Sequence, residues 1–358
     1  MREKRCAVGK ELKPRRVLTS GACVRTSRVV RLILVLAPLV LSATSCLISS
    51  QASRGASIIP TAVVTYTIDA SFLLANRYNF TVRDPVYIPL PQNTSFQQSF
   101  VVSIDPPPLR YVRDEDGNVY AIVEVEVPAQ SKIWISARYK VIVTAYRLEG
   151  EVYTWPPLEV VRRYTSSSGY WDIYNETLIE LAYRVGFAHW PTEVARRLAE
   201  WVVRRVNYRV QLSRLGSNHA VVRGFFDYAI VGDCVEVADV YVTLARILGL
   251  PARTAFGLLL TDISGRMWLN LSTIAQEGEA LLEHWGGHMW PQIYLPGLGW
   301  VDVDMLDGMK PNVGVYSERH IVFGFEETKY YGSALGSAPI PSYLRLEYVE
   351  YVYRGERS

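Results

Sequence analysis

One cysteine stands apart from the other three in this 358-residue sequence. Cys234 lies in the segment GDCVEVADVYVTLARILGLPAR, whereas the other three cysteines fall within the first 46 residues. Apolar residues recur at helical spacing after it, and Gly249 and Pro251 would end that helix. Cys234 is therefore predicted in the first helical turn, where unpaired backbone N–H groups and the helix dipole favour a thiolate and could hold an oxyanion. Such surroundings suit a nucleophile.

A nucleophilic thiol needs a base, and the sequence offers five histidines. His288 opens HMWPQIYLPGLGWVDVD, which has the alternation of a β-hairpin. The return strand of this hairpin carries Asp302 and Asp304 on one face. A carboxylate beside the imidazole would fix the tautomer of the ring and stabilise the imidazolium that forms beside a thiolate.

The register of this hairpin decides whether the carboxylate can reach the imidazole. If Leu295 pairs with Trp300, Asp304 falls on the wrong face for His288. If Leu295 pairs with Gly299, Asp304 falls diagonal to His288 and within reach. We therefore predict a three-residue loop, or a bulge that has the same effect.

These motifs resemble those of the transglutaminase-like superfamily, a branch of the papain-like cysteine-protease fold. The resemblance rests on Gly-x-Cys opening a helix that ends Leu-Gly-Leu-Pro-Ala-Arg, then His-x-Trp, then Tyr-Leu-Pro-Gly-x-Gly-Trp-Val-x-x-Asp. It covers about residues 175–310 and implies Cys234 as nucleophile, His288 as base and Asp304 as the orienting carboxylate. The sequence departs from the family's pattern at Met289, where alanine is usual, and in the long stretch 261–287.

Other readings of the neighbouring residues stay open. A single cysteine on an apolar helix is most often buried packing, but its two partners in strand context favour catalysis. Asp302 is an alternative orienting carboxylate. Arg253 is predicted to make structural hydrogen bonds at the turn from helix to strand. Trp290 and Trp300 either line a substrate-binding cleft or fill the core.

The sequence favours no metal and no cofactor. His284 and His288 have a metal-like spacing, but Gly286 and Gly287 between them make a shared helical face improbable. The carboxylates of residues 302–308 lack the spacing of an EF-hand loop. The remaining histidines are predicted to be ordinary surface or core residues: His189, His219 and His320.

The N-terminus has a composition of its own. Residues 1–31 carry ten Lys or Arg and two Glu, a charge of +8, so the rest of a chain with net charge +3 carries −5. An apolar run follows at residues 32–50 and predicts a signal peptide or a membrane anchor, with the basic segment on the cytoplasmic side. The acidic remainder has no basic patch, which argues against nucleic-acid binding.

The rest of the sequence predicts an α+β protein. Residues 61–150 alternate like strands and indicate a β-sandwich domain of about seven strands. Helical patterns follow at Glu176–Val185 and Pro191–Val206, within a transglutaminase-like core at residues 151–310 where the cysteine helix packs on an antiparallel sheet. The strands predicted in residues 311–358 either extend the core sheet or return to the sandwich.

Together these features predict an exported or membrane-anchored cysteine hydrolase, a peptidase or amidase that works through an acyl-enzyme. Its expected partners are a peptide or protein substrate and, through the N-terminal segment, a membrane. A transglutaminase with an amine acceptor uses the same three residues. A non-catalytic binding protein at the cell surface is the alternative from another class, and the intact set of three residues argues against it.

Overall fold

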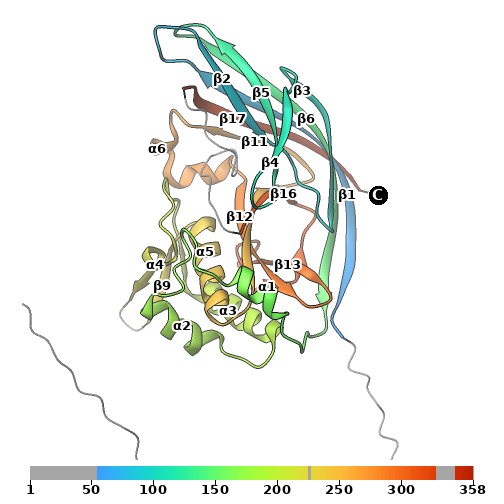
Figure 1. Ribbon diagram of the computed structural model, residues 1–358, viewed down its shortest axis with the longest axis vertical. Coiled ribbons are helices and arrows are strands. Elements are labelled where there is room, and N and C mark those ends of the chain that lie inside the picture. The colour runs from blue at the N-terminus through green and yellow to red at the C-terminus, as the bar shows by residue number, and fades with distance from the viewer. Residues whose placement is uncertain (1–54, 225–226, 328–342, 358) are drawn as a thin grey trace, which may run out of the picture. The chain divides into compact units, whose positions relative to one another are not determined.

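The computed structural model describes residues 55–224, 227–327 and 343–357. Long curved strands gather at one end of this part of the chain and the helices at the other, with a sheet of shorter strands between them (Figure 1). The segments 1–31 and 32–50 lie outside the described residues. Within the described residues, none of the helices combines the length and the apolar character that crossing a membrane requires.

The N-terminal region is rich in strands, as predicted, and has six of them rather than about seven between residues 57 and 149. They are β1 (Ser57–Ala75), β2 (Val82–Pro89), β3 (Gln97–Asp105), β4 (Arg110–Arg113), β5 (Val119–Val127) and β6 (Lys132–Glu149). In β1 alternate side chains from residue 64 to residue 74 are buried, which is the period-two pattern of a strand with one face on a core. That core lies between two sheets.

The larger of these two sheets takes strands from all parts of the described chain. Its order is β11-β17-β1-β6-β15, and β3 also pairs with β6. The added strands are β11 (Ser264–Asn270), β15 (Val315–Tyr316) and β17 (Arg345–Arg357). The smaller sheet has the order β2-β5-β4, and its inward side chains share one apolar core with those of the larger sheet. Strands distant in sequence therefore complete the N-terminal layers.

Four helices within residues 176–247 pack around a second apolar core: α2 (Glu176–Gly186), α3 (Pro191–Arg205), α4 (Ser217–Ala220) and α5 (Cys234–Ile247). The other described helices are α1 (Leu158–Tyr164) and α6 (Ile274–Glu277), and α6 packs against the first core together with the 3₁₀ turn Gly278–Glu283 that follows it. Helix α3 begins with proline at its first position and buries Val194, Leu198 and Val202, as its spacing predicted. A small sheet of β7 (Val206–Tyr208), β9 (Tyr228–Gly232) and β8 (Val221–Arg223) lies beside α5.

The central sheet has five antiparallel strands in the order β14-β13-β12-β10-β16. They are β10 (Ala252–Leu259), β12 (Gly287–Leu295), β13 (Gly299–Asp304), β14 (Asn312–Val313) and β16 (His320–Glu326). Helix α5 packs against β12 and β10 and is buried from Glu236 to Arg246, so it forms the centre of this region. The predicted α+β class, with the cysteine helix on an antiparallel sheet, is confirmed. The C-terminal strands do both things left open: β16 extends the central sheet and β17 joins the N-terminal one.

Candidate active site

Helix α5 begins at Cys234, and local sequence fixes that start. The side chain of Asp233 accepts a hydrogen bond from the backbone N–H of Val235 at 3.0 Å, and Glu236 accepts one from the N–H of Asp233 at 3.1 Å. This reciprocal capping box satisfies N–H groups that a helix otherwise leaves unpaired. Gly232 packs directly on Glu236, where a β-carbon would collide. The triplet Gly-Asp-Cys therefore places the thiol at the first helical position.

The β12–β13 hairpin brings the histidine and the carboxylate together. Leu295 lies opposite Gly299, so the connecting loop has three residues, as predicted. Gly299 has a φ of +80°, a conformation that glycine adopts without strain. The same register carries Asp304 at the end of β13 to His288 near the start of β12. The sequence prediction of this pairing is confirmed.

The carboxylate of Asp304 is held from several sides. Its Oδ2 atom lies 3.0 Å from Nε2 of His288, and its Oδ1 accepts the backbone N–H groups of Leu306 at 2.9 Å and Asp307 at 3.2 Å. Burial would raise the pKa of Asp304, but His288 and the other donors outweigh it and hold that pKa well below its usual range. The carboxylate is therefore ionised and accepts hydrogen bonds only.

The imidazole of His288 connects this carboxylate to the thiol. Burial would lower the pKa of His288, but the charge and hydrogen bond of Asp304, followed by Cys234, raise it to about 10. Because Nε2 faces Asp304, Nδ1 is the ring nitrogen left for the hydrogen bond with Cys234. The structure thus places the predicted imidazole between the thiol and the carboxylate, in contact with both.

The surroundings of the thiol differ from those the sequence suggested. Burial, followed by the negative charge of Asp233, raises the pKa of the Cys234 thiol, although His288 and the backbone N–H of Met289 act in the opposite direction. We expected the helix N-terminus to favour the thiolate, but burial and the carboxylate that caps the helix raise the pKa of the thiol instead. Cys234 keeps some exposed surface and is the free cysteine among the described residues.

The sequence model of the transglutaminase-like superfamily matches residues 179–305, which contain all three side chains. Residues 179–305 are a transglutaminase-like domain. A protein of Haemophilus influenzae without an assigned function is 31% identical over 123 residues, which are 34% of this chain and 33% of that protein. The chain thus spans about a third of the length of the curated relative it matches.

The described fold is similar to that of a solved structure at low sequence identity. A chain from Cytophaga hutchinsonii, provisionally named a cysteine protease, is 12% identical with a TM-score of 0.51, over 84% of this chain and 92% of that one. The periplasmic domain of TgpA from Pseudomonas aeruginosa is 17% identical with a TM-score of 0.32, over 64% of this chain and 71% of that one.

Sequence reasoning missed a tyrosine beside the thiol of the transglutaminase-like domain. Tyr208 ends β7, pairs with Gly232 of β9, and accepts a hydrogen bond from the backbone N–H of Cys234 through its hydroxyl. The backbone N–H of Val235 is already bonded to the helix cap. The N–H groups expected to be free for an oxyanion are therefore engaged, and the Tyr208 hydroxyl is a polar group placed next to the sulfur.

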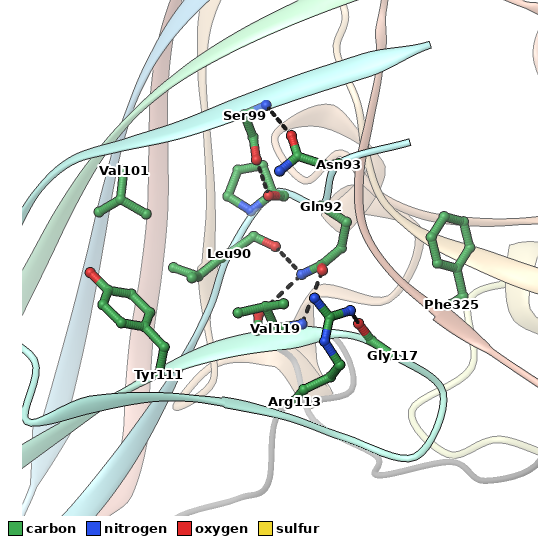
Figure 2. A pocket seen from close by; sticks show the side chains of 11 residues that line it. Leu90, Gln92, Asn93, Ser99, Val101, Tyr111, Arg113, Gly117, Val119 and Phe325 are labelled. Carbon is green, nitrogen blue, oxygen red and sulfur yellow. Dashed lines mark hydrogen bonds between the residues drawn. The ribbon is translucent and has the colours of Figure 1, made fainter. Parts of the chain in front are cut away.

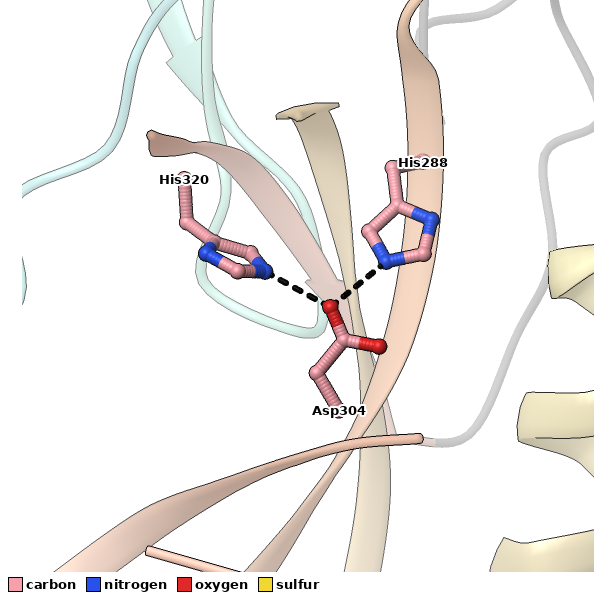
Figure 3. Close-up of side chains that lie close together, drawn as sticks. All are labelled: His288, Asp304 and His320. Carbon is pink, nitrogen blue, oxygen red and sulfur yellow. Dashed lines mark hydrogen bonds and ion pairs between the residues drawn. The ribbon is translucent and has the colours of Figure 1, made fainter. Parts of the chain in front are cut away.

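A second histidine was also missed. His320, predicted to be an ordinary residue, begins β16 and is only 2% exposed. Its Nε2 lies 2.8 Å from Oδ2 of Asp304, the same oxygen that His288 faces. Figure 3 shows the two imidazoles pointing at this oxygen from opposite sides. The sequence gives no local pattern that links His320 to Asp304, because the two residues lie 16 positions apart and on different strands.

The alternative carboxylate has another task in the transglutaminase-like domain. Asp302 accepts hydrogen bonds from the Trp290 indole at 2.6 Å, the Gln292 amide at 2.8 Å and the Tyr146 hydroxyl at 2.6 Å. Trp290 is 1% exposed and lies beside His288, with ring centroids 5.6 Å apart and planes 19° from parallel. We therefore assign Trp290 a packing role behind the imidazole, because a direct contact with substrate would require exposed surface.

Arg253 has the structural role that its position predicted. Its guanidinium bonds Glu327 at 2.6 Å and Gln292 at 3.0 Å, and it lies between the rings of Trp300 and Phe325. Arg253 is only 9% exposed and these contacts hold it within the central sheet, so its role is structural.

His284 and His288, the two histidines with metal-like spacing, do not belong to one ligand group among the described residues. His284 stacks on Trp268 with ring centroids 4.5 Å apart, and its Nε2 lies 2.8 Å from Glu277. The group that does converge is His288, Asp304 and His320, whose ligand-type atoms lie within 4.8 Å of one another. Because both imidazoles already sit at hydrogen-bond distance from the carboxylate, we read this group as a proton network.

A separate pocket of about 280 Å³ opens in the N-terminal region (Figure 2). Its wall is made by the segment after β2, by β3, β4 and β5, and by Phe325 of β16. Gln92 fills part of it and bonds the backbone at Leu90 and Val119. The lining contains no cysteine and no histidine, so this pocket is not the place of the thiol chemistry.

Proposed function

We propose that this protein is a thiol hydrolase that cleaves amide bonds through an acyl-enzyme on Cys234. The match to a transglutaminase-like domain supports a cysteine-dependent hydrolase or acyltransferase. The observation that carries the proposal is the continuous set of contacts from Cys234 through His288 to Asp304. Cys234 itself lies at the start of a buried helix. A buried structural cysteine has no need of an imidazole that is itself held by an ionised carboxylate.

The proposed reaction moves one proton between sulfur, imidazole and substrate. His288 takes the thiol proton while the sulfur of Cys234 bonds to the carbonyl carbon. The C–N bond then breaks, His288 gives the proton to the departing amine, and a thioester remains on the sulfur. Water loses a proton to His288 and attacks the thioester. The C–S bond breaks, His288 gives that proton to the sulfur, and the acid leaves as the thiol is restored. Asp304 stabilises the imidazolium in both halves.

The tetrahedral oxyanion needs donors close to the sulfur. The Tyr208 hydroxyl accepts from the Cys234 N–H and keeps its own proton for another acceptor. We place the oxyanion against this hydroxyl, because a polarised donor aimed at developing charge is worth most in a site with little water. This assignment replaces the free helical N–H groups that the sequence suggested.

Hydrolysis and transamidation share these residues and differ in the acceptor. The test incubates the full-length protein with a glutamine-containing peptide and a fluorescent primary amine, and follows peptide cleavage, ammonia release and amine incorporation. We expect hydrolysis that Cys234→Ala abolishes. Amine incorporation in excess of hydrolysis would make the protein a transglutaminase. Activity that survives in Cys234→Ala would rule out catalysis by this thiol, whereas a wild-type protein that shows neither activity would favour the binding-protein alternative.

We also propose that the hydrolase acts outside the cytoplasm. The support is the order of a +8 segment at residues 1–31 followed by the apolar run at residues 32–50. We expect protease added to intact spheroplasts to digest the catalytic region. Protection of the protein until the cells are lysed would contradict this placement.

A further inference from the structure

The carboxylate of Asp304 is shared between two histidines that come from different strands. His288 belongs to β12 and His320 to β16, and β10 separates these two strands in the sheet. Gly257 of β10 lies opposite His288 in the strand pairing. A β-carbon at Gly257 would lie 1.9 Å from the carbonyl oxygen of Ile321, so only glycine lets β16 come this close. The fold therefore holds the second imidazole near the same carboxylate.

The hydrogen bond to Asp304 places a proton on Nε2 of His320. Nε2 faces Oδ2 of the ionised Asp304 at 2.8 Å, so it must donate. Nδ1 lies 2.8 Å from the hydroxyl of Ser317, which can donate to it. With a proton on Nε2, the ring satisfies both contacts. The ring also lies edge-on to Trp290 at 4.9 Å, and the side chain is 2% exposed, so its orientation is set by packing as well.

The second donor changes what the carboxylate offers to His288. Oδ2 accepts from both imidazoles and Oδ1 accepts two backbone N–H groups. Each donor stabilises the negative charge, so the oxygen that His288 faces is a weaker proton acceptor than it would be alone. A weaker partner lets the imidazolium give up its proton more readily, and general acid catalysis to a departing amine requires that step.

We propose that His320 is a positioning residue of the thiol site, which orients Asp304 and moderates the hold of that carboxylate on the His288 proton. The catalytic part of this proposal rests on the proposed hydrolase function, and the effect on the His288 proton does not. The titratable groups that act on His288 are Cys234 of α5 and Asp304 of β13, and His320 of β16 shares the carboxylate. Asp233 and Tyr208 of β7 lie beside Cys234, and Tyr316 of β15 packs on His320.

The test compares His320→Leu, which removes the donor, with His320→Gln, which keeps an N–H at similar reach. The full-length protein has five histidines, so ring NMR can follow His288 through a pH titration once His288→Gln identifies its signal. We expect the His288 midpoint to rise in His320→Leu and to stay near the wild-type value in His320→Gln. We expect kcat to fall about tenfold to a hundredfold in His320→Leu, less than when an orienting carboxylate is lost, because two backbone N–H groups still hold Asp304.

Controls separate this proposal from a purely structural role and from the hydrolase proposal. The exposed His189→Leu serves as the matched control and should change neither readout. Melting temperatures show whether the His320 variants fold. An unchanged or lowered His288 midpoint in folded His320→Leu overturns the proposal, as does the same shift in both His320 variants. If no preparation hydrolyses any peptide while the midpoint still rises, the hydrolase function fails and the positioning role stands.

Discussion

At the scale of single residues, the site is governed by where one proton is held. Burial and Asp233 raise the pKa of the Cys234 thiol, while Asp304 raises the pKa of His288 to about 10. The reactive form of this pair has lost one of its two protons, and the two groups titrate as a unit. The fraction of reactive enzyme therefore increases as the pH rises from neutral.

The reactivity of the thiol with a small alkylating agent follows from these directions. We expect alkylation of Cys234 by iodoacetamide to increase with pH and to reach half its maximum above the ~8.5 of a free thiol. His288→Ala should move the midpoint higher still, because it removes contributions that lower the thiol pKa. Rapid alkylation below pH 7 would contradict this picture and would indicate a preformed thiolate.

Tyr208 allows a direct test of the oxyanion assignment. Tyr208→Phe removes the hydroxyl and leaves the ring in place, so we expect kcat to fall by about 10²–10³ with little change in KM. Alkylation of Cys234 serves as the control for an intact thiol site. An increase in kcat would show instead that the hydroxyl blocks the backbone N–H of Cys234 in the free protein.

At the scale of elements, the site depends on the register in which neighbouring strands pair. The hairpin register places Asp304 beside His288, and the pairing of β10 with β16 places His320 on the other side of the same carboxylate. Gly257 stands where these pairings meet, because its missing side chain leaves room for the backbone of β16. One glycine therefore contributes to both stability and the geometry of the site.

Gly257→Ala should separate β10 from β16. The added carbon would press on the backbone carbonyl of Ile321, which cannot rotate away as a side chain can. We expect a loss of about 1–3 kcal/mol in the free energy of unfolding, measured by urea denaturation, together with lower kcat. Gly55→Ala is the matched control, since nothing lies within 4 Å of its added carbon. Equal stabilities of the two variants would contradict the close approach.

At the scale of the whole described molecule, a buried ion network joins the helical region to the central sheet. Arg214, from the segment after β7, bonds Asp239 of α5 at 2.5 and 2.8 Å and Glu326 of β16 at 2.8 Å. Trp171 and Thr254 donate to the two carboxylates as well. The three charged side chains are at most 3% exposed, so each depends on the others for compensation.

Arg214→Met should therefore be strongly destabilising. Removing one partner leaves two buried carboxylates without a counter-charge, which typically costs about 3–5 kcal/mol. Burial already raises the pKa of Glu326 to about 7, and the loss of arginine raises it further. The deficit in unfolding free energy should then be larger at pH 8, where the carboxylates must ionise, than at pH 5, where they can take up protons. The exposed Arg83→Met should show no comparable loss, and a deficit independent of pH would argue against this account.

The sequence by itself determined the features that depend on short segments. The capped start of α5 at Cys234 follows from Gly232, Asp233 and the apolar spacing behind them. The register that brings Asp304 to His288 follows from a three-residue loop and the strict alternation of strands. Such local rules involve neighbours along the chain, so they can be read without knowing the fold.

Only the tertiary structure decided what lies around these residues. Tyr208 and His320 reach the site from β7 and β16, and no local pattern marks them because their partners lie 26 and 16 positions away in sequence. The fold also decided that Asp302 accepts a hydrogen bond from Trp290, and that the partly buried thiol lies beside a carboxylate rather than at a free helix end. The physical reason is that hydrogen bonding and desolvation depend on distances through space, which the packing of strands and helices sets.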